Sequence, residues 1–577
     1  MVVTAVIRIR ILAAGLGVSL VLTGAGVSSA PAGSANSWPA GINLDNATIP
    51  QLEHAMDAGT LSSVDLTNFY LHRIDQLNPL LHAVITVNPD ALALARASDA
   101  ARRSGHVRSP IEGIPVLLKD NIGTGDREPT TAGSLALVNA KSPDAFLVTK
   151  LRAAGAVIIG KTNLSEWANF RSTQSTSGWS AVGGVVSNPY ALDHNACGSS
   201  SGSAAAAAAD LATVTVGTET DGSIVCPSAT NGDVGLKPSV GVVSRTGIVP
   251  ISHEQDTAGP ITRNVTDAAV LLGVLQGMDP ADPATAAAQG HTFSDYTQFL
   301  NPAALRGARI GIWRQGNEGL NSDTDAIFSN AVSELRALGA TVVDPVVPPG
   351  LSDIGGPEFT ALLCEFKQDI NSYLAALPGS HPADLAGLIA FDNANAAREM
   401  PFFGQEIFQM AQATQPGSTA CVTARQQATS LAQNSINSLV KADHLDAIVA
   451  VTGSPAWETD LVLGDHDIIA TSTPAAVAGY PDITVPAGSA FDLPVGISFM
   501  GPQWSEPETL ALAYSFEQGT HARRAPRFLT TTPTTDGVNP RPPGSSGTGQ
   551  VSVPAGGAPV QSVTPGNPAS APYGRRF

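Results

Sequence analysis

In some segments of the chain apolar residues recur at the spacing of a helix, and in others they form the short runs typical of strands. The two kinds of segment alternate. In residues 48–78 apolar positions recur at helical spacing and predict two helices, with Thr48 and Ser62 as their N-caps. Residues 83–87 (AVITV) and 114–118 (IPVLL) are short apolar runs of the kind found in strands. The first part of the chain therefore predicts helices and strands in mixed order.

Two later segments combine a helix, a glycine and a strand. Residues 146–160 (FLVTKLRAAGAVIIG) predict an amphipathic helix that stops at Gly155 and a β-branched strand after it. Residues 331–343 (AVSELRALGATVV) repeat this design with Gly339. Further strand candidates are residues 308–313, 446–451, 482–486 and 496–500. Such alternation predicts an α/β fold in which a mixed β-sheet carries helices on both faces.

Composition separates one large folded domain from a C-terminal tail. Residues 350–440 are helical in pattern and poor in strand signals, so they predict a helical subdomain or cap within one domain that spans residues 36–527. Residues 528–577 are rich in Pro, Gly, Ser and Thr and predict a disordered tail, because such a segment cannot bury enough apolar surface.

The first 35 residues have the order of a secretory signal. Arg8 and Arg10 precede an apolar stretch at residues 11–26, and small residues follow at 28–30. The apolar stretch is shorter than the roughly 20 residues of a membrane span, although an uncleaved anchor is the alternative. We expect a secreted protein that is not bound to a membrane once residues 1–35 are removed.

Charge narrows the range of partners. The chain of 577 residues has 31 Lys and Arg against 49 Asp and Glu, a net charge of −18, and 43% of its residues are hydrophobic. This composition supports a large core and excludes global disorder. No basic stretch suits a phosphate backbone, so nucleic acid is not an expected partner. The sequence does not indicate an oligomeric state.

The four cysteines leave their pairing open. Cys197, Cys226, Cys364 and Cys421 allow three complete pairings, and four buried thiols are the alternative. Cys364 and Cys421 share the helical region and can pair with each other. No CxxC motif or His/Cys cluster is present, so we expect no structural metal site.

Two loops rich in glycine and serine flank a run of six alanines at residues 204–209. The first loop, residues 197–203 (CGSSSGS), precedes a predicted alanine helix, whose first backbone N–H groups lack intrahelical acceptors. After a predicted strand at residues 212–217 the second loop ends in Ser223, where a hydroxyl can face successive backbone amides. The residues that would mark a phosphate-binding loop or a G-x-S-x-G elbow are missing. A plain turn with exposed serines remains the alternative.

A serine nucleophile needs a base to take its proton. His194 lies near the first loop, but it stands alone in a polar turn. Lys119, Lys161 and Lys237 each adjoin an apolar run and can lose their charge by desolvation, or extend their amines outward to water. The residues alone do not rank these three lysines.

Several motifs together resemble the amidase signature family, over roughly residues 45–525. The closer likeness is to its bacterial peptide amidase branch, through residues 163–184, 188–203 and Asp221. The motifs that carry the family resemblance are residues 111–122, 197–209, 216–229, 233–250, 255–269, 479–488 and 493–501.

The resemblance implies a Ser–cis-Ser–Lys triad. Ser223 would be the nucleophile, Ser199 the bridging serine and Lys119 the general base. No metal or cofactor is implied. The backbone N–H groups that would form the oxyanion hole are those of Thr220, Asp221, Gly222 and Ser223.

This chain departs from the commoner family pattern at several positions. Asp221 replaces a glycine, and Val225 stands where many members carry an arginine that could pair with a substrate carboxylate. Valine there favours substrates with an uncharged end. Ser201 replaces a glycine and is expected to be structural. Three further residues are expected to bind substrate or support the triad: Ser175, Thr176 and Ser177.

The expected activity is hydrolysis of carboxamides, R–CO–NH2, to a carboxylate and ammonia, with C-terminal peptide amides as substrates. The alternatives are a broad aliphatic or aryl amidase, an amidotransferase subunit that releases ammonia for a tRNA-linked substrate, and a non-catalytic binding protein on the same scaffold. The signal-like segment and the net charge of −18 oppose the amidotransferase.

Overall fold

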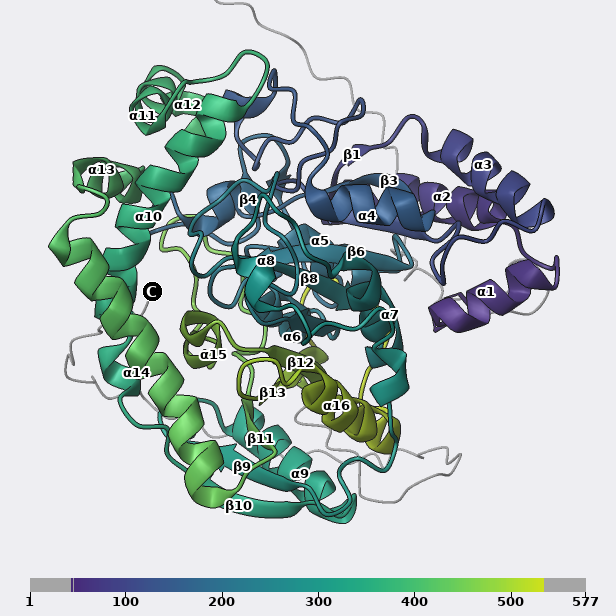
Figure 1. Ribbon diagram of the computed structural model, residues 1–577, viewed down its shortest axis with the longest axis vertical. Coiled ribbons are helices and arrows are strands. Elements are labelled where there is room, and N and C mark those ends of the chain that lie inside the picture. The colour runs from purple at the N-terminus through teal and green to yellow at the C-terminus, as the bar shows by residue number, and fades with distance from the viewer. Residues whose placement is uncertain (1–42, 45, 534–577) are drawn as a thin grey trace, which may run out of the picture. The chain divides into compact units, whose positions relative to one another are not determined.

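An 11-stranded mixed sheet forms the centre of the fold. The computed structural model describes residues 43, 44 and 46–533 (Figure 1). In spatial order the strands are β1 (Val84–Val87), β3 (Val157–Thr162), β2 (Pro115–Lys119), β6 (Val214–Glu219), β8 (Thr257–Thr262), β7 (Val234–Lys237), β12 (Asp482–Ala490), β13 (Leu493–Met500), β11 (Ala447–Val451), β9 (Arg309–Trp313) and β10 (Thr341–Val346). Strands β4 (Trp179–Ser180) and β5 (Gly184–Val185) pair separately.

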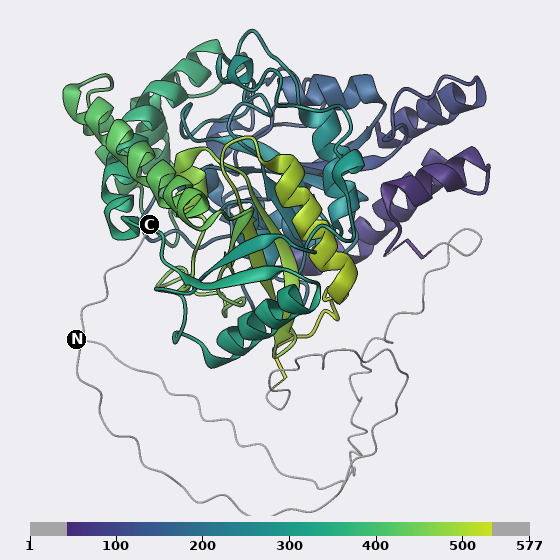
Figure 2. The ribbon, with the colours of Figure 1, turned by 60° about the horizontal axis from the view of Figure 1, so that its bottom comes forward.

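Helices cover both faces of this sheet. One layer contains α5 and α6, which contact each other, and a second row consists of α7, α16 and α9 (Figure 2). The helices are α1 (Ile49–Asp57), α2 (Ser63–Leu81), α3 (Ala91–Arg103), α4 (Phe146–Ala154), α5 (Ser201–Ala208), α6 (Val225–Thr230), α7 (Val265–Leu275), α8 (Ala284–Ala287), α9 (Ser322–Ala337), α10 (Gly355–Ala376), α11 (Leu385–Ala394), α12 (Ala396–Glu399), α13 (Glu406–Ala413), α14 (Thr419–Asp443), α15 (Thr473–Ala478) and α16 (Glu506–Thr520).

The predicted α/β fold is confirmed, and most of the predicted elements are present. Ser62 caps α2 through its hydroxyl, which accepts a hydrogen bond from the amide of Asp65 at 3.0 Å. Gly155 and Gly339 end their helices with φ values of +89° and +98°. Helix α5, built from the alanine run, is buried along its whole length. Its small side chains let it pack closely against the sheet.

Two central strands, β7 and β8, carried no clear sequence signal. Strand β8 contains Gly259 and Pro260, a pair that argues against a central strand. Gly259 is needed there because a Cβ atom would lie 2.0 Å from the carbonyl oxygen of Leu236 on the neighbouring strand. Tertiary packing therefore overrides the local preference.

Residues 350–440 are helical, as predicted. Helices α10–α14 lie together (Figure 1), and α10 packs against α14. The Cys364–Cys421 disulfide joins these two helices. Phe366 of α10 and Phe408 of α13 stack at 5.2 Å between ring centroids in a separate apolar cluster. We call α10–α14 the helical subdomain.

The predicted signal segment, residues 1–35, and most of the predicted tail lie outside the described residues. Contacts continue slightly beyond the predicted boundary at residue 527. The amide of Phe528 donates to the carbonyl of Pro189, and the carbonyl of Leu529 accepts from the amide of Leu192. Among the residues that are described, none of the helices has the length and apolarity that crossing a membrane requires.

Candidate active site

Parallel pairing of β2 with β6 places Lys119 next to Thr218. Leu118 is in register with Val216, so Lys119 at the end of β2 lies beside the end of β6. The Lys119 Nζ atom donates to the carbonyl oxygen of Thr218 at 3.1 Å and approaches its hydroxyl at 2.9 Å. The Nζ atom also lies 2.7 Å from the hydroxyl of Ser199.

The surroundings of Lys119 favour its neutral form. Its side chain is fully buried, and this desolvation lowers the pKa of the amine from 10.5 to about 7. The carboxylates of Asp256 and Glu219 oppose the shift without cancelling it. Lys119 can therefore exchange a proton near neutral pH.

The loop before α5 presents Ser199 to this amine. The peptide bond between Gly198 and Ser199 is cis, as the family resemblance implied. The carbonyl of Ser199 accepts from the amide of Ser165 at 3.1 Å. The Ser201 hydroxyl donates back to the carbonyl of Cys197, which agrees with the structural role expected for it.

Ser223 lies in the loop that leaves β6. Gly222 has a φ of +80°, a conformation that side chains rarely adopt, and it turns the chain toward α6. Ser223 is 8% exposed. Its carbonyl oxygen accepts from the amide of Ser200 at 3.2 Å, so the two serine loops are in direct contact.

Backbone amides in the Ser223 loop are available as donors. The carboxylate of Glu219 accepts from the amides of Ile224 at 2.7 Å and Val225 at 3.1 Å, which fixes the start of α6. In the described part of the chain, by contrast, no acceptor faces the amides of Asp221, Gly222 and Ser223. Unpaired amides of this kind can hold a developing oxyanion.

The Asp221 side chain is anchored away from these amides. Its carboxyl accepts from the hydroxyls of Ser472 at 2.5 Å and Thr473 at 2.7 Å, at the start of α15. Burial raises the pKa of Asp221 to about 6. Its side chain thus fixes the loop to α15, and the oxyanion role of its backbone amide stays a prediction.

Gln255 and Asp256 support the loop from the other side, and sequence reasoning assigned them no role. Gln255 Nε2 donates to the carbonyl of Thr220 at 2.9 Å, and the Thr220 hydroxyl donates to Asp256 at 2.6 Å. Gln255 also donates to Glu358 of α10 at 2.7 Å and accepts from Arg425 of α14 at 3.0 Å. The pair thus connects the loop to the helical subdomain. In the sequence these two residues are marked only by lying in residues 255–269, one of the motifs that resemble the amidase signature family.

The three residues expected to bind substrate contact other segments of the chain. Ser177 donates from its hydroxyl and its amide to Asp465, at 2.6 and 2.9 Å. The Thr176 hydroxyl donates to the carbonyl of Asp460 at 2.8 Å, and that of Ser175 to the carbonyl of Ser172 at 2.9 Å. Their substrate-binding role stays a prediction.

The other two lysines and His194 have different partners. Lys161 is buried, donates to the carbonyl of Ile122 at 2.7 Å and lies 3.5 Å from Asp120. Lys237 donates to the carbonyl of Pro238 at 3.2 Å. His194 is 2.6 Å from the carboxylate of Asp193. Of the three lysines, Lys119 is the one hydrogen-bonded to a serine of the two loops.

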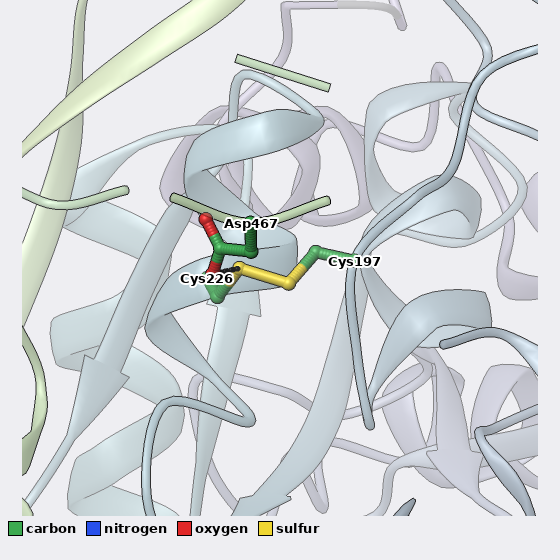
Figure 3. A group of neighbouring side chains, drawn as sticks. All are labelled: Cys197, Cys226 and Asp467. Atoms are coloured by element: carbon green, nitrogen blue, oxygen red, sulfur yellow. Dashed lines mark hydrogen bonds between the residues drawn. A yellow bond between two sulfur atoms is a disulfide. The ribbon is translucent and has the colours of Figure 1, made fainter. Parts of the chain in front are cut away.

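The cysteine pairing, which the sequence left open, is Cys197–Cys226 and Cys364–Cys421. Cys197, Cys226 and Asp467 cluster closely enough to suggest metal ligands (Figure 3). The two sulfur atoms are bonded to each other, however, and a disulfide offers no thiolate to a metal ion. This cluster does not have the chemistry of a metal site.

A buried lysine, two serine loops and a set of free amides lie together where β2 and β6 end, and this arrangement suits a hydrolase of the amidase class. The family model described as Amidase matches residues 65–510. The chain belongs to the amidase signature family, whose members hydrolyse amide C–N bonds.

Individual relatives agree with this assignment. The crystal structure of the native peptide amidase from Stenotrophomonas maltophilia is 49% identical, covers 84% of this chain and 99% of its own, and superposes with a TM-score of 0.80. A probable amidase of Arabidopsis thaliana is 42% identical over 88% of this chain and 97% of its own. A glutamyl-tRNA(Gln) amidotransferase subunit from Acinetobacter baumannii is more distant, at 34% identity over 84% of this chain and 98% of its own.

Replacement of Gly198 by alanine is expected to lower kcat by at least about 10-fold, because small displacements of reacting groups are costly. An added Cβ atom would lie 2.2 Å from Ser165 Oγ and 3.0 Å from Ser201 Oγ, so the Ser199 loop would have to move. Steady-state kinetics of amide hydrolysis measure this effect. Gly356→Ala in α10 is the control, since no atom lies within 4 Å of its Cβ position and activity should be kept. Equal kcat for the Gly198 variant and the wild type would contradict the expectation.

The pH profile should show the pKa of Lys119. A general base works when it is neutral, so kcat/KM should rise with pH, reach half its maximum at about pH 7 and level off at higher pH. In Asp256→Asn the loss of a carboxylate that favours the charged amine should move this rise to lower pH. A rise that stays in place in the variant would argue that another group titrates.

Replacement of Gln255 by leucine should lower kcat by about 10-fold through loss of loop positioning, a smaller effect than loss of an oxyanion donor. The variant removes the hydrogen bond to the carbonyl of Thr220. Gln298→Leu is the comparison, because the exposed Gln298 side chain donates to the carbonyl of Asp295 and does not contact Thr220. If the two variants lose the same activity, Gln255 has no specific effect on the loop.

Proposed function

We propose that the protein is an exported amidase that cleaves C-terminal carboxamides of peptides through a Ser223–Ser199–Lys119 triad. One observation carries the proposal. A fully buried amine with a pKa of about 7 lies 2.7 Å from the hydroxyl of Ser199. The Ser199 loop in turn contacts the loop that bears Ser223.

In the first step the oxygen of Ser223 attacks the carboxamide carbon. Its proton passes to the oxygen of Ser199 while Ser199 gives its own proton to the neutral amine of Lys119, because a hydroxyl can donate and accept at once. The amides of Asp221, Gly222 and Ser223 donate to the negative oxygen of the tetrahedral intermediate.

In the second step the tetrahedral intermediate collapses. Lys119 returns the proton through Ser199 to the leaving nitrogen, ammonia departs, and an ester to Ser223 remains. Water then attacks this ester and loses a proton along the same route. The carboxylate is released and Ser223 recovers its hydrogen.

Charges near the site favour an amide substrate with an uncharged end. Val225, two residues after Ser223 at the start of α6, is apolar and offers no positive charge to a substrate carboxylate. Burial and the nearby charge of Asp221 together raise the pKa of Glu358 to about 8. Neither acid offers a positive charge that could pair with a substrate carboxylate. The likeness to peptide amidase over nearly all of that chain supports peptide amides.

Export is part of the proposal. It rests on the order of charged, apolar and small residues in 1–35. Two disulfides support it, because such bonds form and persist in oxidising compartments. Detection of the protein in the medium of expressing cells, without residues 1–35, tests this part.

The amidotransferase subunit is the second candidate, favoured by its 34% identity over 508 residues. The net charge of −18 makes a tRNA-linked substrate a poor match. Glutamine-dependent amidation in the presence of partner subunits, with no hydrolysis of peptide amides, would decide for this candidate.

Replacement of Ser223 by alanine should abolish ammonia release from a C-terminally amidated peptide, with a fall in kcat of about 10³-fold or more as expected for a lost nucleophile. Ser438→Ala is the control, since this exposed hydroxyl on α14 donates only to its own helix. Ammonia release is compared across peptide amides, aliphatic amides, aryl amides and amino acid amides.

Three results would change the proposal. Release from aryl or aliphatic amides alone would replace the peptide substrate with the broader amidase activity. A Ser223→Ala variant as active as the wild type would remove the triad. Failure of the wild-type protein to form a covalent adduct with a fluorophosphonate would favour a binding protein on an amidase scaffold.

A further inference from the structure

A covalent bond joins the two loops that carry the proposed reacting serines. Cys197 lies two residues before Ser199, and Cys226 lies three residues after Ser223, in the first turn of α6. The disulfide between them connects the Ser199 loop to that helix (Figure 3). Each end of the bond is thus close in sequence to one reacting group.

Hydrogen bonds also link the two loops. The hydrogen bond from the amide of Ser200 to the carbonyl of Ser223 has a length of 3.2 Å. The side chains of Thr230 and Asn231 reach the carbonyl of Ala196 at 3.1 and 2.9 Å, at the far end of α6. The disulfide is the covalent link between the Ser199 loop and the start of α6.

The end of β6 supports both serine loops: the Ser200 hydroxyl donates to the Thr218 carbonyl at 3.0 Å and accepts from the Thr218 amide at 3.2 Å. Beyond β6 the supports differ. Ser199 is tied to Lys119 and Ser165, on β2 and after β3. Ser223 follows β6 and depends on Glu219, which fixes the next two amides. A small shift of α6 would therefore move Ser223 and leave Ser199 in place. Proton transfer between two hydroxyls requires hydrogen-bond distance, so such a shift would stop the transfer.

We propose that the Cys197–Cys226 disulfide is a positioning element of the active site. It holds the start of α6, and with it the Ser223 loop, against the Ser199 loop, and amidase turnover depends on it. This inference rests on the proposed triad. The two cysteines contact no substrate and exchange no proton; they act through the serines beside them.

The chain contains its own matched control. The Cys364–Cys421 disulfide joins α10 to α14, and neither cysteine is near a reacting serine in sequence. It spans 57 residues of chain, against 29 for Cys197–Cys226. In the chain-entropy picture the longer loop gives the larger stabilisation. A general loss of stability should therefore be at least as large without Cys364–Cys421.

The experiment compares two double variants, Cys197→Ala/Cys226→Ala and Cys364→Ala/Cys421→Ala. Alanine keeps the Cβ atom at Cys197, where φ is +53°. We measure kcat and KM for ammonia release from an amidated peptide well below the Tm of each variant. The first variant should lose kcat by about 10- to 100-fold, as for a misplacement of up to about 1 Å, with KM within about 2-fold. The second should keep kcat and show only a lower Tm.

Reduction provides a second measurement in case the first variant does not fold. The Cys364→Ala/Cys421→Ala protein contains one disulfide, which a dithiol such as dithiothreitol converts to two thiols while the dithiol is oxidised to its own disulfide. Turnover should fall on reduction, while circular dichroism stays native, and recover on reoxidation. Mass spectrometry confirms the redox state.

The rate at which a fluorophosphonate labels Ser223 separates the two proposals. Slower labelling of the reduced or Cys197→Ala/Cys226→Ala protein supports the positioning role, even if the wild type releases no ammonia from peptide amides and the proposed substrate is wrong. Unchanged kcat and labelling with the disulfide gone would overturn the positioning role. An equal loss of kcat in both double variants would also overturn it. Wild-type protein that is not labelled at Ser223 would overturn both proposals.

Discussion

The groups around the Lys119 amine can form hydrogen bonds with both its protonated and its neutral form. The carbonyl of Thr218 is an acceptor in either state. The hydroxyls of Thr218 and Ser199 can each donate or accept, so they can reverse direction when the amine loses a proton. Because burial penalises the charged form and Asp256 and Glu219 favour it, the two states are close in free energy near neutral pH. The proposed chemistry depends on this balance.

The sheet makes that environment possible. Parallel strands β2 and β6 end at the same edge, and Lys119 and Thr218 meet there as a consequence of register. The buried helix α5 comes directly before β6 in the chain, and the Ser199 loop leads into its first turn. Asp221 and Glu219 then fix the Ser223 loop through their side chains. Each reacting group lies at the end of a strand, follows a strand or precedes a helix, and such rigid elements preserve geometry during turnover.

The sequence predicted the architecture better than the site. Apolar runs at residues 114–118 and 446–451 predicted strands, whereas Gly259 and Pro260 concealed β8 because local preference and tertiary packing oppose each other there. Physical reasoning left three lysines open, and all three are buried. What distinguishes Lys119 is a serine hydroxyl 80 residues away, a contact that only the family resemblance could anticipate. The roles of Gln255 and both disulfides likewise depend on contacts between distant segments.

The two disulfides bear on the cellular compartment proposed for the protein, because a disulfide persists only under oxidising conditions. A bond beside both reacting serines is useful only where it stays oxidised, so a positioning disulfide and export past the reducing cytosol are mutually consistent. The two ideas are nevertheless independent, because a buried disulfide can persist without being needed for turnover. The second bond shows the distinction: Cys364–Cys421 ties α10 to α14, and these helices reach the Thr220 carbonyl through Glu358, Arg425 and the side chain of Gln255. A covalent bond adjoins the reacting groups, whereas hydrogen bonds through Gln255 connect the Thr220 loop to the helical subdomain. Displacement of the subdomain by a substrate would therefore strain the Gln255 contacts before it disturbed Ser199 and Ser223.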